Sequence, residues 1–234
     1  MILGNLGNCK SADLFVRMIS HSNVKIVNYT TEDYDGVMQI FKSGCYEHIS
    51  YGIRHGWKKP RVALFLSTSL LLIPISIKYA LICLILLWCF HAYCVYRIYH
   101  GYYSFHMNTD MKDRELKFWT TPPNAYLLAK VNDTVVGMVS FQHNDEKTAE
   151  LNRMSIHDQY RRLGIAKMLT EDLIQLLKKQ GYKKVVATTT SNQVGAHRFY
   201  ENFGFVNTRI IYFGSFWADY CSGMYILEYI YDLV

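Results

Sequence analysis

The sequence predicts a mixed α/β fold, in which an apolar helical hairpin interrupts a sheet with flanking helices. Segments with strand and helix periodicity follow one another in the order β-α, insert, β-β-β, α, β, α, β-β. An almost continuous apolar stretch, residues 62–96, lies between the first helix and the second strand. A basic loop then joins the fourth strand directly to a helix that begins with small residues.

The composition limits the range of functions. The 234 residues suffice for one domain with an appendage, and half of them are hydrophobic. The formal net charge of +6 comes from Lys and Arg residues that are scattered rather than gathered on one helix, so nucleic-acid binding is not expected. The six cysteines include no C-x-x-C pair, so we expect no metal site and no disulfide framework.

The first elements precede the apolar stretch. Residues 24–29 have the composition of a strand, and residues 30–33 resemble a capping box that opens a helix. Apolar residues recur at helical spacing up to Phe41, and Gly44 is the expected end of this helix.

The apolar stretch is broken at Pro74 and Lys78. As helices, residues 62–77 and 79–96 would be about 24 Å and about 27 Å long. Both lengths fall slightly short of a hydrocarbon core of about 30 Å. We therefore expect a hairpin or re-entrant loop that bends near the break, with a pair of buried core helices as the alternative.

Basic residues flank this stretch on both sides. Lys58, Lys59 and Arg61 precede it, and Arg97 follows it. Because cytosolic flanks of membrane segments are enriched in Lys and Arg, both ends are expected on the cytosolic side. An even number of crossings, or none, would also keep the elements before and after the stretch in one folded domain.

The remaining elements follow in order. Residues 110–121 are expected to form a polar connector. The predicted strands are residues 125–131, 135–141, 148–156 and 184–190, with a final pair at 205–212 and 224–231. The predicted helices are residues 165–179 and 194–202.

The segment from Gln159 to Ala166 carries the chemistry. Amide N–H groups at a helix start lack intrahelical partners and bind phosphate. Gly164 and Ala166 have little or no side chain, so a diphosphate could approach the backbone, and Arg161 and Arg162 add fork-shaped donors. Taken alone, the same pattern also fits a basic helix start without function.

Here the sequence resembles the GNAT N-acetyltransferases. Residues 161–166 fit their acetyl-CoA loop, Arg/Gln-x-x-Gly-x-Gly/Ala. Asn192, Ala196 and the run Phe-Tyr-Glu-Asn-Phe-Gly-Phe at 199–205 fit their second motif. Further segments, at 44–48, 109–111, 135–139 and 164–167 together with the apolar insert, look like the camello-like group, which includes cysteine S-conjugate and aspartate N-acetyltransferases. This similarity begins near residue 24.

The resemblance implies a function and a place. The chain would transfer acetyl from acetyl-CoA to the amine of a small molecule, an amino acid or a cysteine conjugate, with no metal. It would attach to the endoplasmic reticulum membrane and its lipid, with the catalytic domain facing the cytosol. The expected division is a tail (1–23), the first strand and helix (24–57), a membrane-associated hairpin (58–98) and the main acetyltransferase domain (99–234). A protein lysine acetyltransferase and a silent CoA-binding membrane module remain alternatives, and the oligomeric state stays open.

The resemblance also suggests catalytic residues. Tyr200 matches the family tyrosine near the CoA sulfur, a general acid for the leaving thiolate; its alternative is a core aromatic residue. Glu150 lies where histone-type members carry their general base, on the same expected strand face as Asn152, Met154 and Ile156. Its alternative is a solvated carboxylate, with a water chain deprotonating the amine instead.

Cofactor-binding residues follow from the same comparison. The main chain of Met154, Ser155 and Ile156 would bind the pantetheine arm and polarise the thioester carbonyl. The diphosphate would lie on the cradle of Arg161, Arg162, Gly164, Ile165 and Ala166. Asn192 would bond the cofactor or order its loop, and its alternative role is a helix N-cap.

Overall fold

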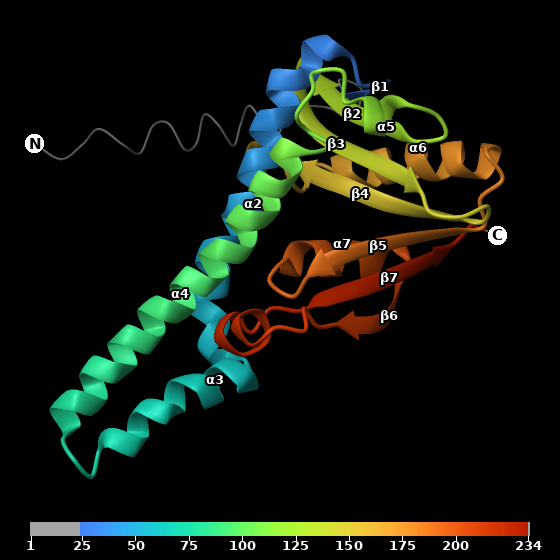
Figure 1. The fold of residues 1–234 in the computed structure, drawn as a ribbon. Helices are drawn as coiled ribbons and strands as arrows, with labels where there is room; N and C mark the ends of the chain where they lie inside the picture. Colours follow the sequence, from blue (N-terminus) through green and yellow to red (C-terminus); the bar gives the residue numbers. More distant parts are fainter. Residues whose placement is uncertain (1–23, 234) are drawn as a thin grey trace, which may run out of the picture. The chain divides into compact units, whose positions relative to one another are not determined.

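The computed structural model describes residues 24–233, which divide into two compact units. The first unit contains residues 24–41, 113–183 and 233, and the second contains residues 42–112 and 184–232. The predicted tail, residues 1–23, lies outside the described residues. Figure 1 labels the elements along the chain.

The first unit holds β1 (Val24–Asn28), the 3-10 turn η2 (Thr31–Asp33), the first turns of α2 (Tyr34–His55), α5 (Lys117–Thr120), β2 (Ala125–Val131), β3 (Thr134–His143), β4 (Thr148–Ile156), the 3-10 turn η5 (Asp158–Tyr160) and α6 (Ile165–Lys179). The second unit holds the rest of α2, η3 (Gly56–Lys58), α3 (Pro60–Ser67), η4 (Thr68–Leu72), α4 (Ile77–Asn108), β5 (Lys184–Thr190), α7 (Val194–Phe203), β6 (Val206–Ile211), the π-helix η6 (Trp217–Ser222) and β7 (Ile226–Asp232).

The strands of the first unit form an antiparallel meander in the order β1-β2-β3-β4. The turn between β2 and β3 has positive φ at both Asn132 (48°) and Asp133 (61°). This is the twist that a two-residue hairpin turn requires, and Asn and Asp tolerate it better than most residues. The predicted turn and its flanking strands are therefore confirmed.

Helix α6 packs across this meander, as Figure 1 shows. Gly137 on β3 makes the close approach possible, since a Cβ there would come within 2.7 Å of Ile156 Cδ1 and within 3.4 Å of Leu169 and Ile165 on α6. The next residue, Met138, faces the opposite side, where it accepts a hydrogen bond from the Tyr126 hydroxyl. Both faces of β3 are thus covered.

The second unit contains an antiparallel three-stranded ladder in the order β5-β7-β6. Within the same unit, the second half of α2 packs against α4. The Tyr46 hydroxyl lies 2.7 Å from His100 Nδ1, and Ile49 and Ile53 surround the buried side chains of Val95 and Tyr99. Apolar burial along α2 and α4 joins the two helices in this unit.

This packing explains a prediction that was wrong. Gly44 does not end the first helix, because α2 continues to His55. A glycine inside a helix costs about 1 kcal/mol relative to alanine. Burial of the side chains that follow it, against α4, outweighs that cost.

The apolar insert also differs in detail from the prediction. Its first arm is shorter than the predicted helix of residues 62–77, because it ends in a 3-10 turn at Leu72. Residues 73–76 form the bend around Pro74. The second arm begins at Ile77, so Lys78 lies in the first turn of α4 and not in the bend. Helix α4 then runs to Asn108, twelve residues beyond the predicted end, because its later turns pack on α2.

Two connections contain structure that the sequence patterns did not indicate. The expected polar connector includes the short helix α5, whose Trp119 is buried. The loop that precedes β7 contains the π-helix η6, and the last strand begins at Ile226 rather than at Met224. The other predicted strands and helices lie within two residues of their observed bounds.

Candidate active site

A β-bulge interrupts β4 at the residues expected to hold the pantetheine arm. The pairing with β3 moves from Ser140↔Asn152 to Met138↔Ser155, so two residues of β4 oppose one of β3. Arg153 takes a left-handed conformation, with φ of 56°. A bulge leaves backbone groups outside the ladder and bends the strand. The expected pantetheine-binding residues Met154 and Ser155 thus lie at an irregularity of the strand.

The bulge overturns one expectation about side-chain direction. Simple alternation would put Glu150 and Ile156 on one face of the strand. The pairs Phe141↔Leu151 and Gly137↔Ile156 show instead that Ile156 shares the face of Leu151, opposite to Glu150. Glu150 is half-buried near the start of β4. The structure does not assign it a catalytic role, and its function as a base stays a prediction.

After the bulge, a short basic loop leads into α6. The Arg161 side chain spans this loop, and its Nε donates to the main-chain oxygen of Ile156 at 3.0 Å. Arg162 and Gly164 both have positive φ, 63° and 78°. Such left-handed residues turn consecutive amides toward one side, which produces an anion-binding concavity.

The start of α6 completes the cradle. Gly164 is the N-cap residue, and the first amide bonded within the helix is that of Met168, which donates to the Gly164 oxygen at 3.0 Å. The amides of Ile165, Ala166 and residue 167 therefore have no carbonyl partner inside the helix. Their partial positive charge adds to that of the helix dipole.

The cradle is accessible on its own unit. Arg161, Arg162 and Gly164 are exposed, whereas the Ile165 side chain is buried against Gly137. Ile165 can therefore contribute only its main-chain amide to a ligand. Gly164, at the turn itself, is exposed and has no side chain, so a diphosphate can approach the backbone there.

The second unit contains Tyr200 and Asn192. Tyr200 lies on α7 and is 4% exposed, in an aromatic cluster with Phe205 and Tyr229. Burial, and then the neighbouring Tyr229, raises the pKa of the Tyr200 phenol above its ordinary value. The phenol is thus protonated at neutral pH, as a general acid must be. The packing also fits a core aromatic residue, so the catalytic role stays a prediction.

Asn192 is buried in the loop between β5 and α7, and it is not the helix N-cap. That position belongs to Gln193, whose side-chain oxygen accepts from the Thr190 amide at 3.1 Å. Asn192 Oδ1 instead accepts a hydrogen bond from Lys59 Nζ at 2.7 Å. Sequence reasoning placed Lys59 among the basic residues at the membrane, so it missed this contact.

The match to known proteins decides the family. Residues 92–205 match the Acetyltransferase (GNAT) family. N-acetyltransferase 8 of Mus musculus is 30% identical over 195 residues, which cover 80% of this chain and 86% of that protein. This chain belongs to the GNAT acetyltransferases, in their camello-like group. It is an acyl-CoA-dependent N-acetyltransferase, and acetyl-CoA is its acyl donor.

Other comparisons agree with this GNAT assignment. The probable N-acetyltransferase camello of Xenopus tropicalis is 28% identical over 86% of this chain and 94% of its own. The human N-acetylaspartate synthetase is 29% identical over 78% of this chain and 62% of its own. A GNAT-family acetyltransferase from Staphylococcus aureus Mu50 matches the fold with a TM-score of 0.56 and 15% identity, over 90% of this chain and 99% of that one. The predicted GNAT fold is therefore confirmed.

Among residues 24–233, no group of three or more His, Cys, Asp and Glu side chains could hold a metal ion. The residues available for chemistry are thus main-chain amides, arginines, a carboxylate, a phenol and an amide side chain.

Proposed function

We propose that this N-acetyltransferase acetylates the amine of a small molecule, an amino acid or a cysteine conjugate. The observation that carries the donor half is the accessible start of α6, where the amides that follow Gly164 lack helical partners. The acceptor half is supported by the similarity to an N-acetylaspartate synthetase, whose name identifies an acetylated amino acid as its product.

The proposed reaction is a direct transfer. The acceptor amine, after losing a proton to Glu150 or to water, attacks the thioester carbonyl and forms the C–N bond. Main-chain amides at the β4 bulge, in residues 154–156, stabilise the oxyanion. The C–S bond then breaks, and Tyr200 donates a proton to the departing sulfur. The new amide nitrogen releases its extra proton to solvent, and solvent returns a proton to Tyr200. No covalent enzyme intermediate is required.

Three substitutions test these roles through separate kinetic parameters. Arg161→Glu and Gly164→Trp should raise KM for acetyl-CoA by at least about tenfold, because they repel or block the diphosphate. Tyr200→Phe should lower kcat by about 10²-fold and leave acetyl-CoA binding unchanged. Isothermal titration with acetyl-CoA and steady-state rates give both parameters. Unchanged acetyl-CoA binding in the first two variants would remove the cradle assignment.

Membrane attachment by the hairpin is the second part of the proposal. Of the described helices, only α4 is long and apolar enough to cross a membrane, and 22% of its most apolar 18-residue window is buried. A core helix would be mostly buried. Exposed apolar side chains cover the arms and the bend (Leu64, Leu70, Leu71, Ile73, Ile75, Ile77, Tyr79, Leu81, Ile82, Leu84, Ile85 and Leu86). Such a patch fits lipid.

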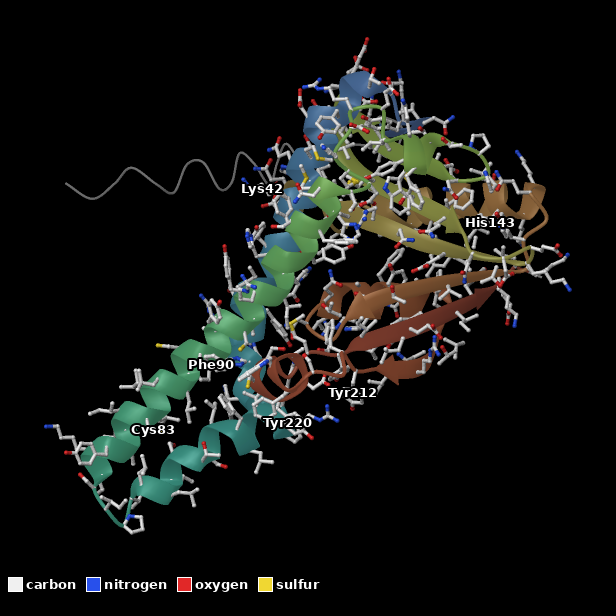
Figure 2. The ribbon with its side chains drawn as sticks, in the orientation of Figure 1. Lys42, Cys83, Phe90, His143, Tyr212 and Tyr220 are labelled. Carbon is white, nitrogen blue, oxygen red and sulfur yellow. The ribbon has the colours of Figure 1, made fainter. Side chains whose placement is uncertain are left out.

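The depth to which the hairpin can insert depends on where α4 begins to pack against the rest of its unit. From His91 to Tyr99, α4 turns buried side chains toward its own unit. The projecting part, residues 77–90, would be about 21 Å long, less than a hydrocarbon core of about 30 Å. The hairpin would therefore enter the bilayer and return without crossing it. Figure 2 shows Cys83 on this projecting part and Phe90 near its base.

Aromatic side chains of η6 and its flanks lie beside the base of the hairpin. Trp217 contacts Phe90, with ring centroids 5.6 Å apart, and Arg61 lies over the rings of Tyr212 and Tyr220, at 4.0 Å and 5.2 Å. Figure 2 labels both tyrosines. Trp, Tyr and Arg favour the lipid headgroup region. This collar supports attachment to a membrane surface, for which the resemblance suggests the cytosolic face of the endoplasmic reticulum.

A further inference from the structure

The Lys59 side chain has different contacts from those of the basic residues beside it in the sequence. It lies between η3 and α3, and Lys58 and Arg61 lie over aromatic rings, of Trp57 and of Tyr212 and Tyr220 respectively. The Lys59 side chain instead reaches the loop after β5. Its Nζ donates to Ser191 Oγ at 3.1 Å and to Asn192 Oδ1 at 2.7 Å, and it lies 5.8 Å from the Tyr225 ring centroid.

The surroundings of this ammonium contain no negative charge. Its partners are a hydroxyl, an amide oxygen and an aromatic ring, and no carboxylate of residues 24–233 forms an ion pair with it. An ammonium has three N–H donors, and the two hydrogen bonds use two of them. Burial lowers the pKa of Lys59 to about 8. A buried cation without a counter-ion is costly, and such groups concentrate at functional sites.

A second donor in the same place also lacks an acceptor. Because an ammonium can only donate, the Asn192 oxygen must face Lys59, so its Nδ2 faces away. This Nδ2 is buried, and it has no hydrogen-bond partner among the described residues. It lies against Gly52 of α2, where an added Cβ would come within 2.5 Å of it. The third N–H of the half-buried Lys59 ammonium is therefore available to an oxyanion, whereas the Asn192 amide is enclosed and holds the ammonium in place.

We infer that Lys59, held in place by Asn192, recognises the carboxylate of the acceptor amine and so selects amino-acid-type substrates. The inference rests on the proposed transfer to a small amine. A carboxylate carries a single charge, which the single Lys59 ammonium balances. A phosphate dianion would require another cation, and the nearest basic residues along the chain, Lys58 and Arg61, lie over aromatic rings.

The test compares acceptors that differ only in this group. L-aspartate and S-benzyl-L-cysteine are each paired with the corresponding α-carboxamide, and rates are measured with the full chain in detergent. Lys59→Met should lower kcat/KM for the carboxylates by at least tenfold, mainly through KM. The carboxamides and the KM for acetyl-CoA should change less than twofold. Lys59→Arg should restore part of the selectivity.

Asn192→Asp provides a second variant, because it puts a carboxylate against Lys59 and neutralises the site with almost no change in shape. Like Lys59→Met, it should lower kcat/KM for the carboxylate acceptors more than for the carboxamides. This second variant keeps the test possible if Lys59→Met does not fold.

The inference would be overturned if kcat/KM fell equally for the carboxylate and the carboxamide of each pair, or if it did not fall for either. It would also be overturned by weaker binding of Lys59→Met to phosphatidylserine vesicles with unchanged selectivity, because the anion would then be a lipid phosphate. Wild-type protein inactive on every amine would instead contradict the proposed function.

Discussion

Lys59 and Arg61 belong to one basic cluster in the sequence, yet they have different environments in the second unit. Arg61 stacks its planar guanidinium on aromatic rings. Lys59 bonds to Asn192 and is largely removed from water, which lowers its pKa. A lysine ammonium responds to burial by losing its proton more readily, so this position is sensitive to pH.

The pH dependence of acceptor selection follows from that pKa. Below about pH 8 Lys59 is charged, and above it the charge and the attraction for a carboxylate are lost. The ratio of wild-type to Lys59→Met kcat/KM, measured for one carboxylate acceptor, should therefore fall as the pH rises from 7 to 9. The ratio cancels the titration of the acceptor amine itself. Two tyrosines lie near this ammonium: the Tyr225 ring is beside it, and Tyr99, whose pKa burial raises, bonds to Thr190, which precedes the same loop. A flat ratio would contradict the assignment.

At the scale of elements, the positions of the site residues depend on two local irregularities. The bulge at Arg153 interrupts the ladder of β4, and the left-handed residues Arg162 and Gly164 turn the loop into α6. The sequence predicted a turn from strand to helix at Gly164, but not the left-handed conformation of Arg162. It did not predict the bulge, because Arg153 has no intrinsic preference for positive φ. Its buried side chain is held by the rings of Phe41 and Trp119.

The contact between β3 and α6 gives a stability prediction. Gly137→Ala should reduce the free energy of unfolding by about 1–3 kcal/mol, because the new Cβ would overlap Ile156 and press on Leu169. Gly101→Ala is the matched control: Gly101 lies inside α4 with no atom within 4 Å of an added Cβ. It should increase stability by about 0.5–1 kcal/mol. Urea denaturation measures both, and equal effects would contradict the packing.

At the scale of the whole molecule, the chain combines an acetyltransferase with an exposed apolar hairpin. The contrast between the two parts is one of burial. Leu71 and Ile75 are 77% and 73% exposed, whereas side chains of similar size on α6, such as Leu169 and Leu173, are fully buried. Exposed surface of this kind is unfavourable in water, and insertion into lipid would remove the penalty.

Membrane binding should depend on the bend of the hairpin. The triple variant Leu70→Asp, Leu71→Asp and Ile75→Asp should bind at least about tenfold more weakly to phosphatidylcholine vesicles, since each charge is costly in hydrocarbon. Vesicle flotation gives the bound fraction.

The control for this test introduces aspartates at Val206 and Ile210, which are also exposed but lie on β6. Binding of the control should match the wild type. If both variants lose the same fraction of binding, the hairpin does not carry the attachment.

The sequence by itself determined the order of the strands and longer helices, the basic turn before α6 and the apolar insert. These features depend on periodicity and on residues close together in the chain, such as Arg161 and Gly164. Tertiary structure alone decided that α2 continues past Gly44, that β4 bulges at Arg153 and that Lys59 turns toward Asn192. Each of these depends on partners far away in the sequence, and the free energy gained by burying them outweighs the local preferences of the chain.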